Sequence, residues 1–234
     1  KRMKLQPVWN LPRILTVLTD KTKQRKVRDL FQQVIALRGR RNPFVAQEGL
    51  VWLGLCLVLV ALLVRYAEPW TAVLPLGLFV WLFLVFRDPI RDVPPAALGV
   101  VSPVDGTVVA AGPVEQGATG GPVQRIRIAV NAFGTYTARA PVEGSIRDLG
   151  KKGLWLQTDE DQDVVLTFAG YRFGLAPRSF ARYGERLGQG QRCAYLRLTR
   201  FAEVEFSADA KVLVEPGQKV RAGSDVLGSL PSTR

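Results

Sequence analysis

Few side chains in this sequence have the chemistry for acid–base, nucleophilic or metal-dependent catalysis. The chain contains no histidine, so it lacks the most common general base and the most common metal ligand. Its two cysteines, Cys56 and Cys193, lie far apart, one in an apolar run and the other in the polar half. This spacing excludes a disulfide framework and a CxxC site. We therefore expect buried or lipid-facing thiols in a reducing compartment, and no metal site.

Asp105 is the acidic residue that stands in the best-defined local motif. Residues 102–108 read SPVDGTV, and an Asp-Gly pair between short β-type runs predicts a tight turn between two strands. A turn residue needs no catalytic role, so the structural interpretation of Asp105 stands beside a catalytic one.

The positive charge of the chain is concentrated at one end. The net charge is +12, and residues 1–41 hold twelve Lys and Arg against two Asp, while the remainder has 20 basic and 18 acidic residues. A chain-wide surface for nucleic acid is therefore not expected. Residues 1–45 are interpreted as a basic amphipathic arm with a helix over 22–37. Such a helix fits either an anionic membrane surface or a partner protein.

Two apolar runs, 49–64 and 70–86, contain no charged residue. Each is close to the ~20 residues that cross a bilayer, and the five residues between them predict a tight hairpin of two transmembrane helices over 46–87. A buried hairpin in a soluble protein is the alternative. The aromatic residues that we expect at the membrane interfaces are Trp52, Tyr66, Trp70 and Trp81.

The segment 88–234 changes to short β-type runs separated by glycine, which predicts one β-rich domain. The expected strands cover residues 100–101, 107–111, 125–130, 153–157, 164–169, 194–198, 202–206 and 211–214. The positive-inside bias puts the basic arm on the cytoplasmic side of a bacterial inner membrane, and two spans return the β-rich domain to the same side. The expected partners are the lipid bilayer and other membrane subunits, with no nucleic acid.

Several short motifs follow one another in a recognisable order. They are AQEG at 46–49, FRDPIRDVP at 86–94, SPVDG at 102–106, IAVNAFGTYTARAPVEG at 128–144, FAG at 168–170 and PGQKVRAG at 216–223. Together they resemble the phosphatidylserine decarboxylase family, particularly its short bacterial and archaeal members. Residues 102–109 and 215–228 also look like the two halves of a lipoyl-like barrel-sandwich hybrid, without a lysine at the modified tip. The expected architecture is thus a membrane hairpin plus a mainly-β domain of this type.

The resemblance implies a specific chemistry. Family members cut themselves at the serine of a Gly-Ser pair, and that serine becomes a pyruvoyl group that forms a Schiff base with the substrate amine. An aspartate and a histidine are thought to activate the serine. The aspartate matches Asp105, the histidine position is Tyr136, and the Gly-Ser pair matches Thr199 and Arg200.

These departures predict a pseudoenzyme without a pyruvoyl cofactor. Arg200 has no hydroxyl group, and the use of Thr199 as nucleophile requires a one-residue slip along a strand. We therefore expect a structural or accessory subunit of a larger inner-membrane complex, with respiratory and photosynthetic assemblies as candidates. Two alternatives stay open: a phospholipid-binding protein in which Arg200 and Arg139 contact the headgroup, and an active pyruvoyl-type decarboxylase with atypical residues.

Overall fold

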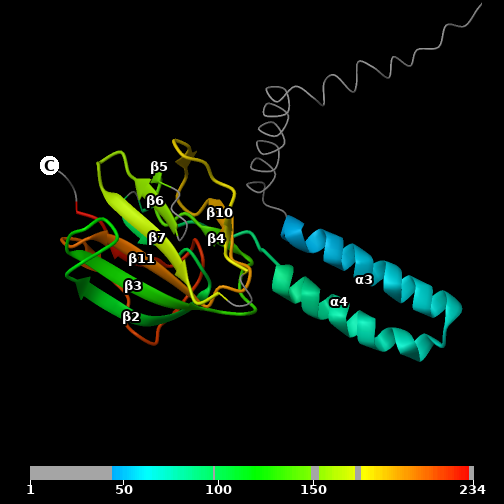
Figure 1. Cartoon of the computed structure of the whole chain (residues 1–234). Coiled ribbons are helices and arrows are strands. Elements are labelled where there is room, and N and C mark those ends of the chain that lie inside the picture. The colour runs from blue at the N-terminus through cyan, green and yellow to red at the C-terminus, as the bar shows by residue number, and fades with distance from the viewer. Residues whose placement is uncertain (1–43, 97, 149–152, 172–174, 232–234) are drawn as a thin grey trace, which may run out of the picture. The chain divides into compact units, whose positions relative to one another are not determined.

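The computed structural model describes residues 44–96, 98–148, 153–171 and 175–231. Almost all of the expected basic arm, including the helix over 22–37, lies outside the described residues. The described chain begins with a helical hairpin and continues into a domain of strands (Figure 1).

The hairpin consists of α3 (Gln47–Tyr66), a short 3-10 helix η1 (Pro69–Ala72) and α4 (Val73–Phe86). Only α3, with 20 residues and a mean hydropathy of 2.2, is long and apolar enough to cross a membrane among the described helices. The apolar segment Trp70–Phe86 is shorter. The prediction of two spanning helices is thus supported for one helix, and the second span stays a prediction.

Large apolar side chains cover the outside of both helices. Val51 is 67% exposed and Leu74 is 85% exposed, and only 17% of the apolar window of α3 is buried. A hairpin in the core of a soluble domain buries such side chains, so this pattern favours contact with lipid. The four expected interface residues are all exposed, at 59% for Trp52, 78% for Tyr66, 73% for Trp70 and 50% for Trp81.

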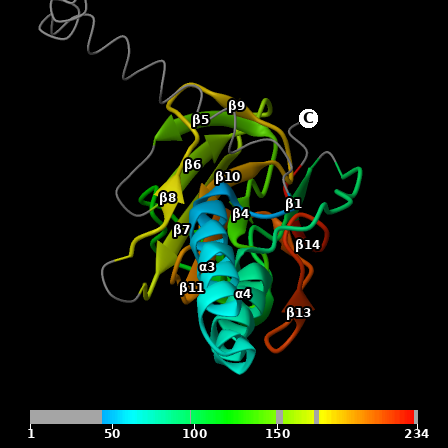
Figure 2. The same cartoon turned by 90° about the vertical axis from the view of Figure 1, so that its right-hand side faces the viewer.

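The remaining described chain is β-rich, as predicted, and contains no further helix in its described part. The strands are β1 (Gly99–Val101), β2 (Gly106–Val114), β3 (Val123–Val130), β4 (Thr137–Arg139), β5 (Gly144–Asp148), β6 (Gly153–Gln157), β7 (Asp163–Ala169), β8 (Arg178–Ser179), β9 (Arg186–Leu187), β10 (Arg192–Tyr195), β11 (Phe201–Ser207), β12 (Lys211–Val212), β13 (Lys219–Val220) and β14 (Val226–Ser229). They form one large sheet in the order β13-β2-β3-β11-β7-β6-β5-β9 and two small sheets, β1-β14-β12 and β4-β10-β8. Viewed along the hairpin, β4 and β10 lie behind its base (Figure 2).

The core is built on the central strands of the large sheet. Val204 of β11 lies opposite Ile126 of β3 on one side and Leu166 of β7 on the other, and all three side chains are fully buried. Each such side chain contributes about 1.5–3 kcal/mol by leaving water. This sheet provides a rigid support for the loops at its ends.

Every expected strand overlaps an observed one, with two notable differences. The expected strand 194–198 ends at Tyr195 because residues 196–199 form a turn. The strands that the sequence did not predict are short: β4, β5, β8, β9, β13 and β14. The segments 102–109 and 215–228 do lie side by side, through the pair Lys219↔Thr107.

Candidate functional site

The two ends of the hairpin meet at the β-domain. The Ala46 amide donates to the Phe86 carbonyl at 2.9 Å, and the Asp88 amide donates to the Phe44 carbonyl at 2.7 Å. Gly49 is required for this close approach, because a Cβ atom at its position would overlap the Phe86 ring. The AQEG and FRDP motifs are therefore two sides of one junction.

A buried network of charges connects Asp88, just after α4, with strands β4 and β10. Asp88 is fully buried and pairs with Arg139 at 3.3 Å and with Arg192 at 2.8 Å. The Thr137 hydroxyl also donates to its carboxylate. Burial raises the pKa of Asp88, while the nearby Arg192 guanidinium and the Thr137 hydrogen bond oppose that shift. The network attaches the end of α4 to β4 and β10.

Arg139, one of the two expected headgroup ligands, belongs to this network. It is 3% exposed and donates to the carbonyls of Gly190 and Pro89 at 3.1 and 3.0 Å. Burial lowers its pKa. Its role toward a lipid headgroup stays a prediction.

Asp105 fixes three segments at the start of β2. Its carboxylate accepts from Arg91 at 2.9 Å, from the Thr135 amide at 2.9 Å and from the Ala222 amide at 2.7 Å. The side chain is buried. These contacts join the junction, the loop after β3 and the loop after β13. Both the structural and the catalytic interpretation of Asp105 stay predictions.

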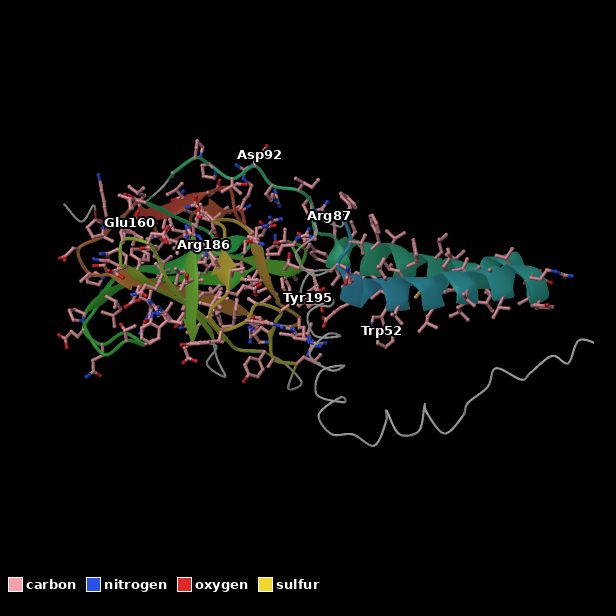
Figure 3. All side chains as sticks on the ribbon, turned by 90° about the horizontal axis from the view of Figure 1, so that it is seen from above. Trp52, Arg87, Asp92, Glu160, Arg186 and Tyr195 are labelled. Carbon is pink, nitrogen blue, oxygen red and sulfur yellow. The ribbon has the colours of Figure 1, made fainter. Side chains whose placement is uncertain are left out.

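Tyr136 lies between the β-domain and the hairpin. Its hydroxyl donates to Glu48 of α3 at 3.0 Å, and its ring packs edge-on against Phe86 with centroids 4.7 Å apart. A second aromatic neighbour is Tyr195, labelled in Figure 3 at the side of the domain that faces the hairpin. Burial, reinforced by the charge of Glu48, raises the pKa of Tyr136. The phenol is therefore a hydrogen-bond donor to Glu48 at neutral pH.

Thr199 and Arg200 lie in the turn between β10 and β11. The Thr199 hydroxyl is buried and donates to the Leu196 carbonyl at 2.6 Å. Arg197, in the same turn, has a φ of 52°, which is unfavourable for a side chain of this size. It is bonded to Glu48 at 3.0 Å. Arg200 is exposed and has no ion pair within the described part of the chain.

One pocket of about 440 Å³ brings three of the four family positions together. Its walls are residues 129–136, residues 196–201, and Trp81 and Val85 of α4. Tyr136, Thr199 and Arg200 thus share one cavity with the hairpin, while Asp105 lies directly behind it through the Thr135 amide.

Sequence reasoning assigned no role to several residues that build this region. Glu48 accepts hydrogen bonds from both Tyr136 and Arg197 of the pocket lining, and Asp88, Arg192 and Arg91 hold the junction. Figure 3 shows Arg87 at the junction itself. A usable signal did exist, because Glu48 and Asp88 are the acidic residues nearest to the ends of the two long apolar runs where these meet the β-domain. Their partners lie 149 and 104 residues away, and no local pattern identifies them.

The sequence matches no protein-family model. Three relatives are named phosphatidylserine decarboxylase proenzyme, and each is 32% identical to this chain. The relative from Nitrosomonas eutropha matches over 209 residues, 80% of this chain and 95% of its own length. Those from Symbiobacterium thermophilum and Xanthobacter autotrophicus match over 211 and 226 residues, which are 82% and 87% of this chain and 98% and 93% of theirs. Among solved structures, the glucose permease IIA from Mycoplasma capricolum is 18% identical, with a TM-score of 0.41 over 56% of this chain and 94% of its own; so low a score establishes no shared fold.

These relatives correct two expectations. They are named as proenzymes of a decarboxylase, so the interpretation of this chain as a non-enzyme conflicts with the proteins it matches. The expectation that it has no cofactor is wrong for the same reason, because the family carries a pyruvoyl group. The loss of a histidine and a serine in one sequence was too weak a basis for either conclusion.

The residues at the matching positions still differ from the family pattern. Thr199 uses its hydroxyl within its own turn, and Arg200 has none. Neither fits the serine precursor of a pyruvoyl group. These two departures do not affect the family assignment, since the match extends over both the hairpin and the β-domain. The chain belongs to the phosphatidylserine decarboxylase family.

Proposed function

We propose that this chain is a membrane protein whose pocket binds the headgroup of phosphatidylserine. The observation that carries the proposal is the lining of the pocket, in which Tyr136, Thr199 and Arg200 stand beside α4. A site next to a membrane helix is accessible to a lipid that never leaves the bilayer.

The lining suits such a ligand chemically. Arg200 is an exposed cation at the pocket, and a guanidinium binds carboxylate and phosphate groups through paired hydrogen bonds. Trp81 and Val85 provide an apolar wall for the glycerol and the first acyl carbons. A cavity of about 440 Å³ lies within the range of small-molecule sites.

The proposal is tested with the full chain in phosphatidylcholine nanodiscs that contain a small fraction of phosphatidylserine. The lipid that co-purifies with the protein after mild detergent extraction is quantified. We expect enrichment of phosphatidylserine with the wild type and its loss with Arg200→Ala. Arg221→Ala is the control, because Arg221 is exposed and lies next to β13, outside the pocket lining. Absence of enrichment with the wild type would overturn the proposal.

Decarboxylation of phosphatidylserine is a second candidate function, supported by the names of the relatives at 32% identity. The assay measures the release of carbon dioxide and the formation of phosphatidylethanolamine by the purified chain. The intact mass is measured on the same sample. Lipid conversion, together with a chain split near Thr199, would support this activity. A full-length mass with no conversion would contradict it.

We also propose the bacterial inner membrane as the location, with the arm and the β-domain on the cytoplasmic side. The apolar outer surface of the hairpin and the basic arm support this arrangement. An accessory role beside other membrane subunits belongs to the same proposal. Gentle solubilisation of the native membrane followed by native size analysis tests it, and a free monomer as the sole species would contradict the accessory role.

A further inference from the structure

The rim of the pocket carries exposed apolar side chains on two separate loops. Phe133, between β3 and β4, is 54% exposed, and Leu198, between β10 and β11, is 44% exposed. Both line the same pocket as Trp81 of α4, which is 50% exposed. Loops 131–135 and 196–200 are called the rim below.

Single exposed apolar residues are common on soluble proteins. The rim differs because its apolar tips are continuous with the apolar surface of a helix of the membrane hairpin. Trp81 lies more than one helical turn from the end of α4 at Phe86, and it still shares the pocket with Phe133. The rim therefore lies beside the last turns of α4.

The backbone of the rim satisfies many of its own polar groups. The Phe133 amide donates to the Asn131 side chain at 3.1 Å, and the Gly134 amide donates to the Asn131 carbonyl at 3.0 Å. In the other loop, the amide and the hydroxyl of Thr199 both donate to the Leu196 carbonyl. Internal pairing lowers the cost of moving a loop out of water.

Cations flank the apolar tip of the second loop. Leu198 stands between Arg197, whose guanidinium is paired with Glu48, and the exposed Arg200. In this arrangement the apolar side chain can enter the membrane while the Arg200 guanidinium stays at the phosphate level. Charge and apolar surface on the rim thus fit a lipid interface better than they fit bulk water.

We infer that the rim inserts into the interfacial layer of the bilayer beside α4, so that the pocket opens sideways to lipid. This inference requires the hairpin to lie in the membrane, but it does not depend on headgroup binding. The apolar side chains of the rim thus contact the interfacial lipid of the bilayer.

The test places an environment-sensitive fluorophore on single cysteines in the full chain, after replacement of Cys56 and Cys193 by alanine. The labelled positions are Phe133→Cys, Leu198→Cys and Thr119→Cys. Thr119 is the matched control, because it is an exposed loop residue at the opposite ends of β2 and β3. The proteins are reconstituted in phosphatidylcholine vesicles, with and without phosphatidylserine, and quenched either by spin-labelled acyl chains or by aqueous iodide.

We expect labels at 133 and 198 to emit at shorter wavelength, to be quenched by the lipid probe and to be protected several-fold from iodide. The label at 119 should show the reverse, and both patterns should be the same in the two lipid mixtures. Labels at 133 and 198 that behave like the label at 119 would overturn the inference. Protection from both quenchers would place the rim against protein, either the same chain or a second copy, and would also overturn the inference. Insertion only with phosphatidylserine would assign the effect to headgroup binding.

Discussion

Glu48→Ala is predicted to disable the pocket without touching its lining. Glu48 belongs to the first turn of α3 and is not part of the pocket wall. Its carboxylate accepts from two side chains of the pocket lining, Tyr136 and Arg197, each at 3.0 Å. It is a positioning residue, because it acts on the pocket through these two side chains.

The size of the effect follows from these two contacts. The side chains of Glu48 and Arg197 are 21% and 29% exposed, so solvent weakens their ion pair to about 1 kcal/mol or less. The half-buried phenol of Tyr136 loses a hydrogen bond to a charged group, which costs about 1–2 kcal/mol. A total of about 2 kcal/mol is comparable to the ~1–3 kcal/mol strain of a residue such as Arg197 at positive φ. The turn is then free to relax, and occupancy of the bound geometry falls by about 30-fold.

The assay is enrichment of phosphatidylserine by the reconstituted chain, compared with thermal unfolding of the same sample. We expect Glu48→Ala to lower enrichment at least as strongly as Arg200→Ala, and Glu48→Gln, which keeps an acceptor for Tyr136, to have a smaller effect. Glu68→Ala is the matched control, since Glu68 is an exposed glutamate at the other end of α3. Normal enrichment by Glu48→Ala, or additive effects of Glu48→Ala and Arg197→Ala in a double-mutant cycle, would refute the reasoning.

Three further predictions concern the junction and its pH dependence. Asp88→Asn leaves two buried guanidinium groups without their counter-charge and should lower the free energy of unfolding in detergent by about 3–5 kcal/mol. The control is Asp92→Asn, which should leave that free energy nearly unchanged, because Asp92 is exposed on the outer side of the junction (Figure 3). Gly49→Ala should lower the unfolding temperature because the added Cβ would overlap the Phe86 side chain. Gly54→Ala is the control and should not lower it, because the space around its Cβ is open. The pKa of Tyr136 is raised in the folded state, so the unfolded chain loses that proton first; the corresponding stability is complete below pH ~10 and declines above it. The decline between pH 9 and 12 should be shallower in Tyr136→Phe, and an identical slope would contradict the assignment.

The hairpin and the central strands could be predicted because their signals are local. An uncharged apolar run implies a helix that needs no partner to satisfy its backbone, and the alternating runs in β3, β7 and β11 bury one face of a sheet. The strands that escaped prediction are two to five residues long. Their conformation depends on partners far away, as in the pairing of Arg192 in β10 with Arg139 in β4.

In the candidate site, too, some features could be predicted from the sequence and others depend on contacts between distant residues. Asp105 and the positions of Tyr136, Thr199 and Arg200 were identified from the order of motifs along the chain. The prediction of a non-enzyme, from the absence of a histidine and of a serine at the matching position, is wrong because the relatives are named as proenzymes. The contacts of Arg139 with Asp88 could not be inferred from sequence, since the two residues lie 51 positions apart.

The sequence by itself determined the apolar helical hairpin, the β-rich domain, the Asp-Gly turn and the family. These are properties of residue order and periodicity, and they do not depend on where distant segments meet. Only the tertiary structure decided that Glu48 joins Tyr136 to Arg197 and that Asp88 lies between two arginines. It also decided that the apolar rim lies beside α4. Hydrogen bonds and ion pairs act over a few ångströms, so long-range contacts exist only after the sheet has brought their residues together.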